Sequence, residues 1–276
     1  MRAVSLSEPL VSIVMPVYNG WPYVTEAVDS VLSQKYSNFE LCIVDNGSTD
    51  ETSSWLETVN DARVSIVSRQ VTQAPADNWT QATRLARGSL VKLVCADDLL
   101  EPSAVEEQVA AMSQEPAAVM VASQRNVIDS QGRVLKRNYG LGGLRGVVAG
   151  VDAIRACLRA GTNLLGEPMS VMFKTSMLLD SMPWGGSSGY LTDLATYARV
   201  IRSAKVLCLP GAVGSFRVST GSWTARIQQD QTDDFRQWRG EVIRDGLVPW
   251  TRRDSLVSSV NLMARTRARH WYLRKA

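Results

Sequence analysis

Short apolar runs alternate with helical patterns through about the first 120 residues of the chain. Four of these runs predict buried strands, at residues 10–17, 39–44, 64–67 and 90–94. After each run, apolar residues recur at three- and four-residue spacing, which predicts a helix packed on the sheet. Strands that alternate with helices form a parallel sheet joined by right-handed crossovers. We therefore expect an α/β fold with a doubly wound, mostly parallel sheet.

Two local signals predict where these helices end and begin. Gly88 follows the helical pattern of residues 78–87, and glycine is the usual residue just beyond a helix C-terminus. Ser103 and Glu106 have the spacing of a capping box, which predicts the start of the helix after the fourth strand.

The alternation loosens after about residue 120. Further strands are predicted at residues 118–122, 168–173, 206–209 and 213–218, and further helices at 151–159 and 193–201. Residues 139–146 form a glycine-rich loop. Because no stretch rich in Gly, Pro or Ser separates two halves, we expect residues 1–222 to form one domain. Residues 223–276 are helical in pattern and basic, and are expected to form a C-terminal extension.

Composition excludes several classes of protein. Of the 276 residues, 45% are hydrophobic and 21% charged, as in ordinary soluble globular proteins. A net charge of +3 without a nucleic-acid-binding motif does not indicate a nucleic-acid partner. His270 is the single histidine, which excludes catalytic triads and metal sites built on histidine. The cysteines, at 42, 95, 157 and 208, lie far apart, as expected of free thiols in a reducing compartment. No signal peptide or apolar run of about 20 residues is present, so we expect a cytoplasmic protein.

Polar side chains follow three of the predicted strands at the point where each strand ends. Asp97 and Asp98 follow the fourth strand, and two carboxylates at the end of such a strand can hold a hard divalent cation with a diphosphate. A solvated turn is the alternative for an isolated Asp-Asp pair. Tyr18, after the first strand, can cover a base. Asp45, after the second strand, can accept the imide N–H of uracil or thymine. Ser48 can bind an anion at the next helix or cap that helix.

Together these motifs resemble those of family 2 glycosyltransferases, inverting enzymes with the GT-A fold. The segments that carry the resemblance are Pro9–Asn19, Ser30–Gln34, Phe39–Asp50, Ala96–Pro102, Gly166–Pro168 and Thr192–Arg199. The resemblance covers about residues 9–218 and is most specific in the first third. It implies a nucleotide-sugar-binding half at about 9–122 and an acceptor half at 123–222.

The resemblance implies a nucleoside-diphosphate sugar, UDP- or dTDP-linked, as donor. It implies nucleotide contacts from Pro16, Tyr18, Asn19, Asp45, Asn46 and Ser48. Asp97 would contact the ribose or the sugar, Asp98 would ligate Mn²⁺ or Mg²⁺ on the diphosphate, and Arg84 would supply a basic contact. Family members often carry Asp at the position of Cys95, and a site with fewer carboxylates would use diphosphate oxygens and water.

An inverting transfer also needs a carboxylate base that takes the proton of the attacking hydroxyl. The resemblance assigns this role to Asp193, although Thr192 stands where the family usually has an acid. Asp193 also starts a predicted helix, so capping is its alternative role. Glu167 is an alternative base or a ligand of the acceptor hydroxyl. Arg217 matches a basic residue close to the diphosphate in many members of the family.

These residues favour transfer of one sugar to a glycan or lipid-linked hydroxyl acceptor, in cell-surface polysaccharide or glycoconjugate synthesis. The Gln-x-x-Arg-Trp motif of processive synthases is absent, and Phe235–Arg239 only scrambles its residue types. The alternative function is a non-catalytic nucleotide-sugar-binding module, which Cys95 and Thr192 keep open. A sugar nucleotidyltransferase is disfavoured, because residues 18–22 lack the basic, glycine-rich loop that cradles a triphosphate.

The C-terminal tail carries an excess of positive charge. From Thr251 onward its basic residues are Arg252, Arg253, Arg265, Arg267, Arg269, Arg274 and Lys275, against one acid, Asp254. Apolar residues lie between them: Leu256, Val257, Val260, Leu262, Met263, Trp271, Tyr272 and Leu273. Such a helix can lie on the inner face of an anionic membrane. The alternative is a helix docked on the domain or on a second subunit in a homodimer.

Overall fold

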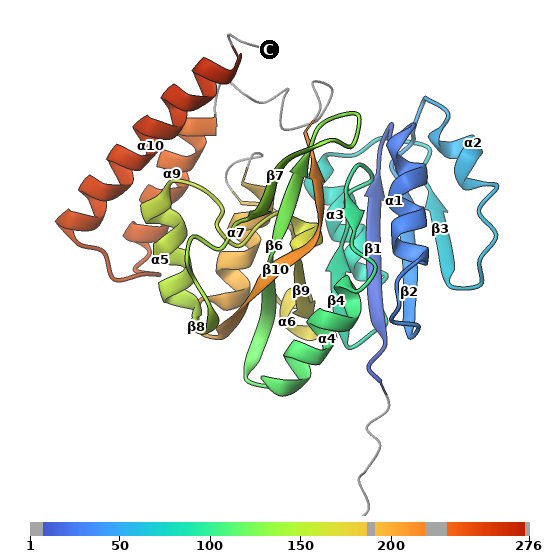
Figure 1. Ribbon diagram of the computed structural model, residues 1–276, viewed down its shortest axis with the longest axis horizontal. Helices are drawn as coiled ribbons and strands as arrows, with labels where there is room; N and C mark the ends of the chain where they lie inside the picture. Colours follow the sequence, from blue (N-terminus) through green and yellow to red (C-terminus); the bar gives the residue numbers. More distant parts are fainter. Residues whose placement is uncertain (1–7, 187–190, 219–230, 274–276) are drawn as a thin grey trace, which may run out of the picture.

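A computed structural model of the chain describes residues 8–186, 191–218 and 231–273, with the backbone alone for 266–273. In these ranges ten strands form one sheet with helices on both faces (Figure 1). The strands are β1 (Val11–Val17), β2 (Phe39–Asp45), β3 (Val64–Ser68), β4 (Leu90–Leu93), β5 (Leu99–Leu100), β6 (Ala118–Ile128), β7 (Val134–Tyr139), β8 (Gly146–Ala149), β9 (Val171–Lys174) and β10 (Lys205–Arg217). The helices are α1 (Tyr23–Leu32), α2 (Thr52–Leu56), α3 (Pro75–Arg84), α4 (Ala104–Gln114), α5 (Gly150–Ala160), the 3₁₀ turn η1 (Pro168–Ser170), α6 (Thr175–Leu179), α7 (Thr192–Ile201), α9 (Gln231–Arg244) and α10 (Arg252–Leu273).

The order of strands in the sheet is β3-β2-β1-β4-β9-β6-β10-β5, with β7 beside β6 and β8 beside β10. Strands β1 to β4 are parallel to one another, and β6 is parallel to β10. Strand β9 runs antiparallel to both β4 and β6, so these two point the same way. The expected doubly wound, mostly parallel sheet is confirmed, with β9 as a reversed strand near its centre.

Successive side chains of a strand point to opposite faces of the sheet, so the apolar core has two parts, one on each face. In β1, Ile13 and Met15 face α1, α2 and α4, whereas Val14 faces α3, α5 and α7. Both sides are buried, which explains why β1 is apolar at almost every position instead of alternating with polar residues. The sheet is therefore held from both faces, and its strand ends are rigid positions for functional side chains.

Of the two local signals for the helix ends, Gly88 was wrong, whereas Ser103 marked the start of α4 correctly. Helix α3 ends at Arg84, before Gly88. A Cβ at Gly88 would lie 2.4 Å from the backbone oxygen of Leu10, so glycine is needed there for close packing against the start of β1. Ser103 stands at the N-cap position of α4, but its side chain makes no capping hydrogen bond.

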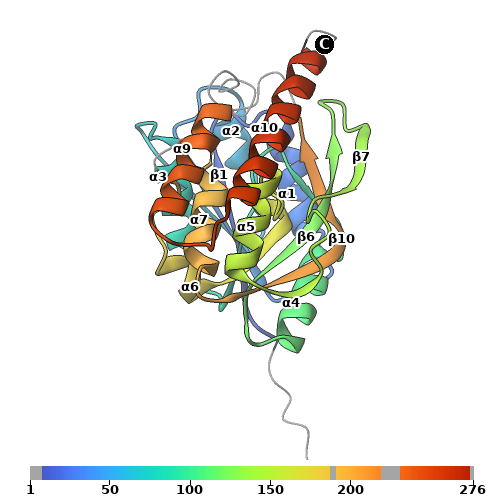
Figure 2. The same ribbon diagram turned by 90° about the vertical axis from the view of Figure 1, so that its left-hand side faces the viewer.

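The C-terminal helices pack on the domain (Figure 2). Phe235 and Trp238 of α9 are buried in the same core as α5 and α7, with their rings edge to face at 5.8 Å. Helix α10 contacts α5, which agrees with the docked alternative for the tail. The boundary expected at residues 222 and 223 falls outside the described residues. So do the side chains of Arg267, Arg269, Trp271, Tyr272 and Leu273, and residues Arg274 and Lys275 altogether. No helix in the described ranges is long and apolar enough to cross a bilayer.

Lys92 of β4 is a buried cation whose charge should weaken the fold. Its side chain is fully buried and donates hydrogen bonds to Gln108 Oε1 (2.8 Å) and the oxygen of Val171 (3.1 Å). Burial lowers the pKa of Lys92 to about 7. Between pH 10 and 7, Lys92 is therefore protonated in the unfolded chain but mostly neutral in the folded chain. Stability should fall with falling pH by up to about 1.4 kcal/mol per pH unit.

We therefore expect the effect of Lys92→Met on the free energy of unfolding to depend on pH. Relative to wild type, the variant should be most favoured at pH 7 and should lose that advantage steadily toward pH 10. Urea unfolding at several pH values measures this difference, and Lys35→Met, at an exposed lysine, is the matched control. A difference that is the same at every pH would show that Lys92 is not neutralised by burial.

Candidate active site

The ends of β1, β2 and β4 meet at one edge of the sheet. The three strands are parallel, with β1 between the other two, so their carboxyl ends lie side by side. A Cβ at Gly20 would lie 3.1 Å from the Cβ of Ala96, so the turn after β1 rests directly against the turn after β4. The structure thus brings the turns that carry Tyr18, Asp45 and Asp97 together, as the sequence predicted.

At the end of β2, the carboxylate of Asp45 is hydrogen-bonded to the residues that directly follow the strand. Its Oδ1 accepts hydrogen bonds from the backbone N (3.1 Å) and Oγ (2.6 Å) of Ser48, and its Oδ2 accepts one from Ser53 Oγ (2.5 Å). Asn19 Oδ1 likewise accepts a hydrogen bond from the backbone N of Thr49 at 2.8 Å. Asp45 and Ser48 are therefore already hydrogen-bonded within the loop. A base could bind to either of them only by replacing one of these hydrogen bonds.

Around this loop, Pro16 is buried within β1 and Tyr18 is 47% exposed. Asn46 is buried and exchanges hydrogen bonds with the backbone of Gln73, at 2.9 and 3.0 Å. Tyr18 is thus the residue of this group whose ring is open to a planar ligand, whereas Pro16 and Asn46 shape the surrounding turns.

The structure does not bring Arg84 to this edge. Helix α3 begins near the end of β1, where Asn78 Nδ2 donates to the oxygen of Val17 at 3.4 Å. Arg84 lies six residues further along the helix, about 9 Å toward the opposite edge of the sheet. There, its neighbour Arg87 forms an ion pair with Glu40 at the start of β2. A contact between Arg84 and a donor at the strand ends is therefore disfavoured.

Arg69 is a basic residue at this edge that the sequence interpretation missed. It directly follows β3, and its backbone N donates to the oxygen of Asp45 at 3.0 Å. Its Nε is buried and finds no hydrogen-bond partner within the described part of the chain. The signal was its place immediately after a parallel strand, the same position that singled out Asp45 and Asp97.

Arg217, at the end of β10, fixes the Asp-Asp turn. It is 1% exposed; its backbone N donates to Asp98 Oδ1 (3.1 Å) and its Nε to the backbone oxygen of Asp97 (3.0 Å). Its Nη2 donates to Glu26 Oε2 at 2.7 Å, and its guanidinium lies 4.5 Å from the ring centre of Tyr23. Arg217 lies beside the aspartates, as expected, but its guanidinium is already engaged by α1.

The two aspartates form a close pair of carboxylates, of which Asp98 is buried and Asp97 half-buried. Asp98 is 1% exposed, and burial, with the charge of Asp97 next in size, raises the pKa of Asp98 well above its usual range. Burial also raises the pKa of Asp97. A divalent cation beside them would relieve this cost, so the oxygen ligands present suit Mg²⁺ or Mn²⁺. The described residues contain no group of three or more acidic, His or Cys side chains that could hold a metal ion. Further ligands would have to be diphosphate oxygens and water.

Asp193 is placed by helix α7 and by the loop before η1. Its Oδ2 accepts a hydrogen bond from Asn163 Nδ2 (2.8 Å), and its Oδ1 accepts one from the backbone N of Leu194 (2.6 Å). The helix begins at Thr192, and the cap position is occupied by Leu191. Burial raises the pKa of Asp193 to about 6, which suits a base that must accept a proton near neutral pH.

Glu167 is engaged by an arginine that the sequence interpretation missed. Arg125 of β6 is buried, and its guanidinium forms an ion pair with the Glu167 carboxylate, with Nη2 2.8 Å from Oε1. Both oxygens of this carboxylate face the guanidinium of Arg125, so Glu167 is less free than Asp193 to contact an acceptor hydroxyl. A charge inside the apolar strand β6 was the signal for Arg125.

Cys95 lies within electrostatic range of several of these acidic groups. Burial raises the pKa of its thiol well above the usual range, and the neighbouring carboxylates of Asp98, Asp97, Asp193 and Glu167 raise it further. The thiol is therefore protonated at neutral pH. The turn after β4 and the start of α7 consequently present carboxylates toward the same region, although nearly 100 residues separate them in the sequence.

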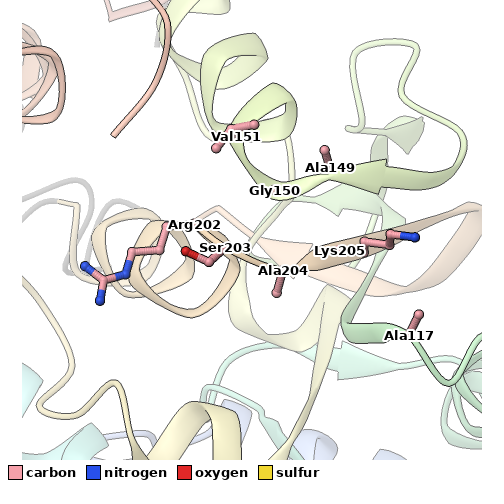
Figure 3. Close-up of a pocket in the computed structure, with 8 residues that line it drawn as sticks. All are labelled: Ala117, Ala149, Gly150, Val151, Arg202, Ser203, Ala204 and Lys205. Atoms are coloured by element: carbon pink, nitrogen blue, oxygen red, sulfur yellow. The ribbon is translucent and has the colours of Figure 1, made fainter. Parts of the chain in front are cut away.

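A shallow hollow of about 510 Å³ lies elsewhere on the molecule (Figure 3). It is lined by Ala117, Ala149, Gly150, Val151, Arg202, Ser203, Ala204 and Lys205. Lys205 is the first residue of β10, whereas Arg217, which contacts Asp98, is the last. The hollow therefore lies at the opposite end of β10 from the two aspartates. The side chains of Arg202 and Lys205 point in opposite directions, so the hollow gathers no converging charges. It is not a candidate active site.

The chain is similar in sequence and in fold to several known proteins. The family described as Glycosyl transferase family 2 matches residues 12–155. Chondroitin synthase from Escherichia coli is 35% identical over 133 residues, which are 48% of this chain and 19% of that protein. This chain therefore spans a small part of that relative.

Two solved structures have the same fold. Staphylococcus aureus TarS 1–349 in complex with UDP-GlcNAc superposes with a TM-score of 0.70 at 16% identity, over 91% of this chain and 71% of that one. The mannosyltransferase PcManGT from Pyrobaculum calidifontis, in complex with GDP-Man and Mn²⁺, gives a TM-score of 0.64 at 19% identity, over 95% of this chain and 70% of that one.

Proposed function

The chain belongs to glycosyl transferase family 2, and we propose that it moves one sugar from a nucleoside-diphosphate sugar to a hydroxyl acceptor with inversion. The observation that carries this proposal is that the carboxylates of Asp97, Asp98 and Asp193, from two separate segments, all act on the thiol of Cys95. Asp97 and Asp98 come from a strand end suited to a diphosphate, and Asp193 comes from the start of α7 with the pKa of a base.

On the donor side, Asp98 would hold a divalent cation on the diphosphate, and Asp97 would contact the ribose or the sugar. When bound, the cation neutralises the negative charge that develops on the departing diphosphate. Tyr18 would cover the base, with Asp45 as acceptor for an imide N–H of a uridine or thymidine donor. Arg69 is better placed than Arg84 to supply positive charge near the nucleotide. TarS in complex with UDP-GlcNAc supports a donor of this chemical class.

On the acceptor side, Asp193 would accept the proton of the attacking hydroxyl. The acceptor oxygen forms a bond to the anomeric carbon, the bond from that carbon to the phosphate oxygen breaks, and the nucleoside diphosphate leaves with the electron pair. Asn163 keeps Asp193 in place through its 2.8 Å hydrogen bond. Glu167, held by Arg125, would form one wall of the acceptor site.

The acceptor is proposed to be a glycan or a lipid-linked glycan in polysaccharide or glycoconjugate synthesis. A chondroitin synthase among the relatives supports an acceptor of this kind. Addition of a single sugar is favoured over polymerisation, because Phe235 and Trp238 of the scrambled motif are buried in the core. Their aromatic rings therefore do not line an acceptor channel.

Incubation with a panel of nucleotide sugars and Mn²⁺ or Mg²⁺ tests the proposal. We expect slow hydrolysis of one UDP- or dTDP-sugar, and thermal stabilisation by the same compound. Stabilisation without any turnover, even with glycan acceptors present, would instead favour the non-catalytic binding module. That alternative is kept open by Thr192 and by the lack of a three-ligand metal cluster among the described residues.

A further inference from the structure

Helix α10 packs on the domain through its polar side chains. Ser258 is fully buried and its Oγ donates a 2.6 Å hydrogen bond to the oxygen of Leu158 in α5. Asn261 Nδ2 and Arg265 Nε donate to the next two backbone oxygens of α5, at 2.8 and 2.7 Å. These donors satisfy carbonyl groups that the last turn of a helix leaves without an internal partner. The docked orientation of α10 is therefore fixed by hydrogen bonds.

The start of α10 is fixed in the same way. Asp254 is 1% exposed, forms a 2.7 Å ion pair with Arg155 of α5, and accepts a 2.9 Å hydrogen bond from the backbone N of Thr251. The hydrogen bond from Arg155 is the largest cause that holds the pKa of Asp254 well below its usual range. The acid of the tail is thus buried and neutralised on the inner side of the helix.

The outer side of α10 is apolar. Leu256, Val260 and Met263 are 67%, 52% and 48% exposed. Their spacing of four and three residues puts them on one stripe of the helix. An ordinary surface helix does the opposite, with its apolar stripe buried and its polar residues in water. Leu262 alone among the apolar residues of this part of the helix is deeply buried, at 5% exposure.

The surroundings of this stripe are positively charged. Arg252 and Arg253, one turn before Leu256, are both exposed. From Thr251 to the end the sequence has seven basic residues and one acid, and that acid is the buried Asp254. An exposed apolar stripe flanked by arginine, with no exposed acid on the described part of the same helix, complements the anionic head groups and acyl chains of a bilayer surface.

We propose that the outer face of α10, built from Arg252, Arg253, Leu256, Val260 and Met263, docks the protein on an anionic lipid surface. The helix lies on that surface, and its inner face stays hydrogen-bonded to α5. Figure 1 shows the C-terminal end of α10 at the same end of the molecule as the carboxyl ends of β1 and β6.

Co-sedimentation of the full-length protein with vesicles tests this proposal. One set of vesicles is phosphatidylcholine alone, and the other is equal parts phosphatidylcholine and phosphatidylglycerol. Wild type should sediment with the anionic vesicles at low salt, and much less with neutral vesicles or at high salt. The triple variant Leu256→Asp, Val260→Asp, Met263→Asp should lose roughly tenfold or more in partitioning, and so should Arg252→Glu with Arg253→Glu.

Leu135→Asp, at an apolar residue of β7 that is 63% exposed, is the matched control and should sediment like wild type. All the changed side chains are exposed, so every variant should fold, and thermal unfolding checks this. Equal sedimentation of wild type and both α10 variants would overturn the proposal, as would the absence of wild type from the anionic pellet. If the triple variant instead breaks a dimer seen by light scattering and wild type ignores vesicles, the face joins two copies of the chain and the proposal is wrong.

Discussion

Asp98→Asn should abolish sugar transfer while the protein stays folded. Asn keeps an oxygen that can accept the 3.1 Å hydrogen bond from the backbone N of Arg217, so the turn after β4 should keep its shape. What the variant loses is a negative charge at a position where burial already makes that charge costly. The folded protein should therefore be at least as stable as wild type. A cation on the diphosphate contributes several kcal/mol to such a transfer, so we expect a loss of roughly 10³-fold in kcat.

The measurement is donor turnover over a series of Mn²⁺ and Mg²⁺ concentrations, with a chelator-treated sample as reference. Wild type should depend on the cation, and Asp98→Asn should stay inactive at every concentration. Asp97→Asn is the matched control, because it removes the neighbouring carboxylate and should mainly raise KM for the donor. Full wild-type activity in excess chelator would rule out the proposed role of Asp98.

Cys95→Asp tests the metal site by adding a carboxylate, whereas Asp98→Asn removes one. It restores the carboxylate that the family often carries two residues before Asp97. Without metal, this additional acid would lie near four others, Asp97, Asp98, Asp193 and Glu167, so the variant should unfold at a lower temperature than wild type. Added Mn²⁺ should raise the melting temperature of the variant back toward that of wild type. The Mn²⁺ concentration that gives half-maximal activity should be lower for the variant than for wild type. A melting temperature that does not respond to Mn²⁺ would argue against a cation beside Cys95.

The sequence predicted most of the fold because the sheet is built from local patterns. The apolar runs and helical spacing before residue 120 match β1 to β4 and α1 to α4 within a few residues. The expected GT-A fold is confirmed by the likeness to the solved structures. The predicted strands at 206–209 and 213–218 are one bulged strand, β10, because pairing with β6 continues past Gly211. Periodicity alone cannot detect such long-range pairing.

The site was predicted where a rule about strand ends applied, and missed where the contacts join distant segments. Asp45, Asp97 and Asp98 follow parallel strands, so topology alone placed them at one edge. Asn163 and Arg125 act on Asp193 and Glu167 across 30 and 42 residues, and no local pattern announces such pairs. Arg84 lies away from this edge for a related reason, because a helical pattern does not tell which end of the helix approaches the strand ends.

The tail shows the limit of amphipathic patterns. The apolar residues of α10 indicated a helix with one apolar side, and the usual inference would bury that side against the domain. In the structure, hydrogen bonds from Ser258 and Asn261 to α5 decide the orientation instead. Leu256 and Val260 consequently face outward.

Asp193→Asn should reduce the rate of transfer by roughly 10²–10⁴-fold, the usual contribution of a positioned general base. Asn has the same shape and can present an oxygen to Asn163 Nδ2, so the start of α7 should keep its geometry. Donor affinity should barely change, because Asp193 lies on the acceptor side. Glu167→Gln is the matched control, at a second half-buried acid that also acts on Cys95, and should cost far less. An unchanged rate in Asp193→Asn would leave Asp193 a purely structural role in α7.

The pH dependence of the rate separates the base from every other carboxylate. Asp193 acts only when ionised, and burial raises its pKa to about 6, so wild-type kcat should rise with pH through about 6 and level off above it. The hydrogen bond from Asn163 favours the ionised form, so Asn163→Ala should move this rise to higher pH. The residual activity of Asp193→Asn should lack the rise altogether. If that variant keeps the wild-type profile, the titrating group is a different carboxylate, and Asp193 is not the base.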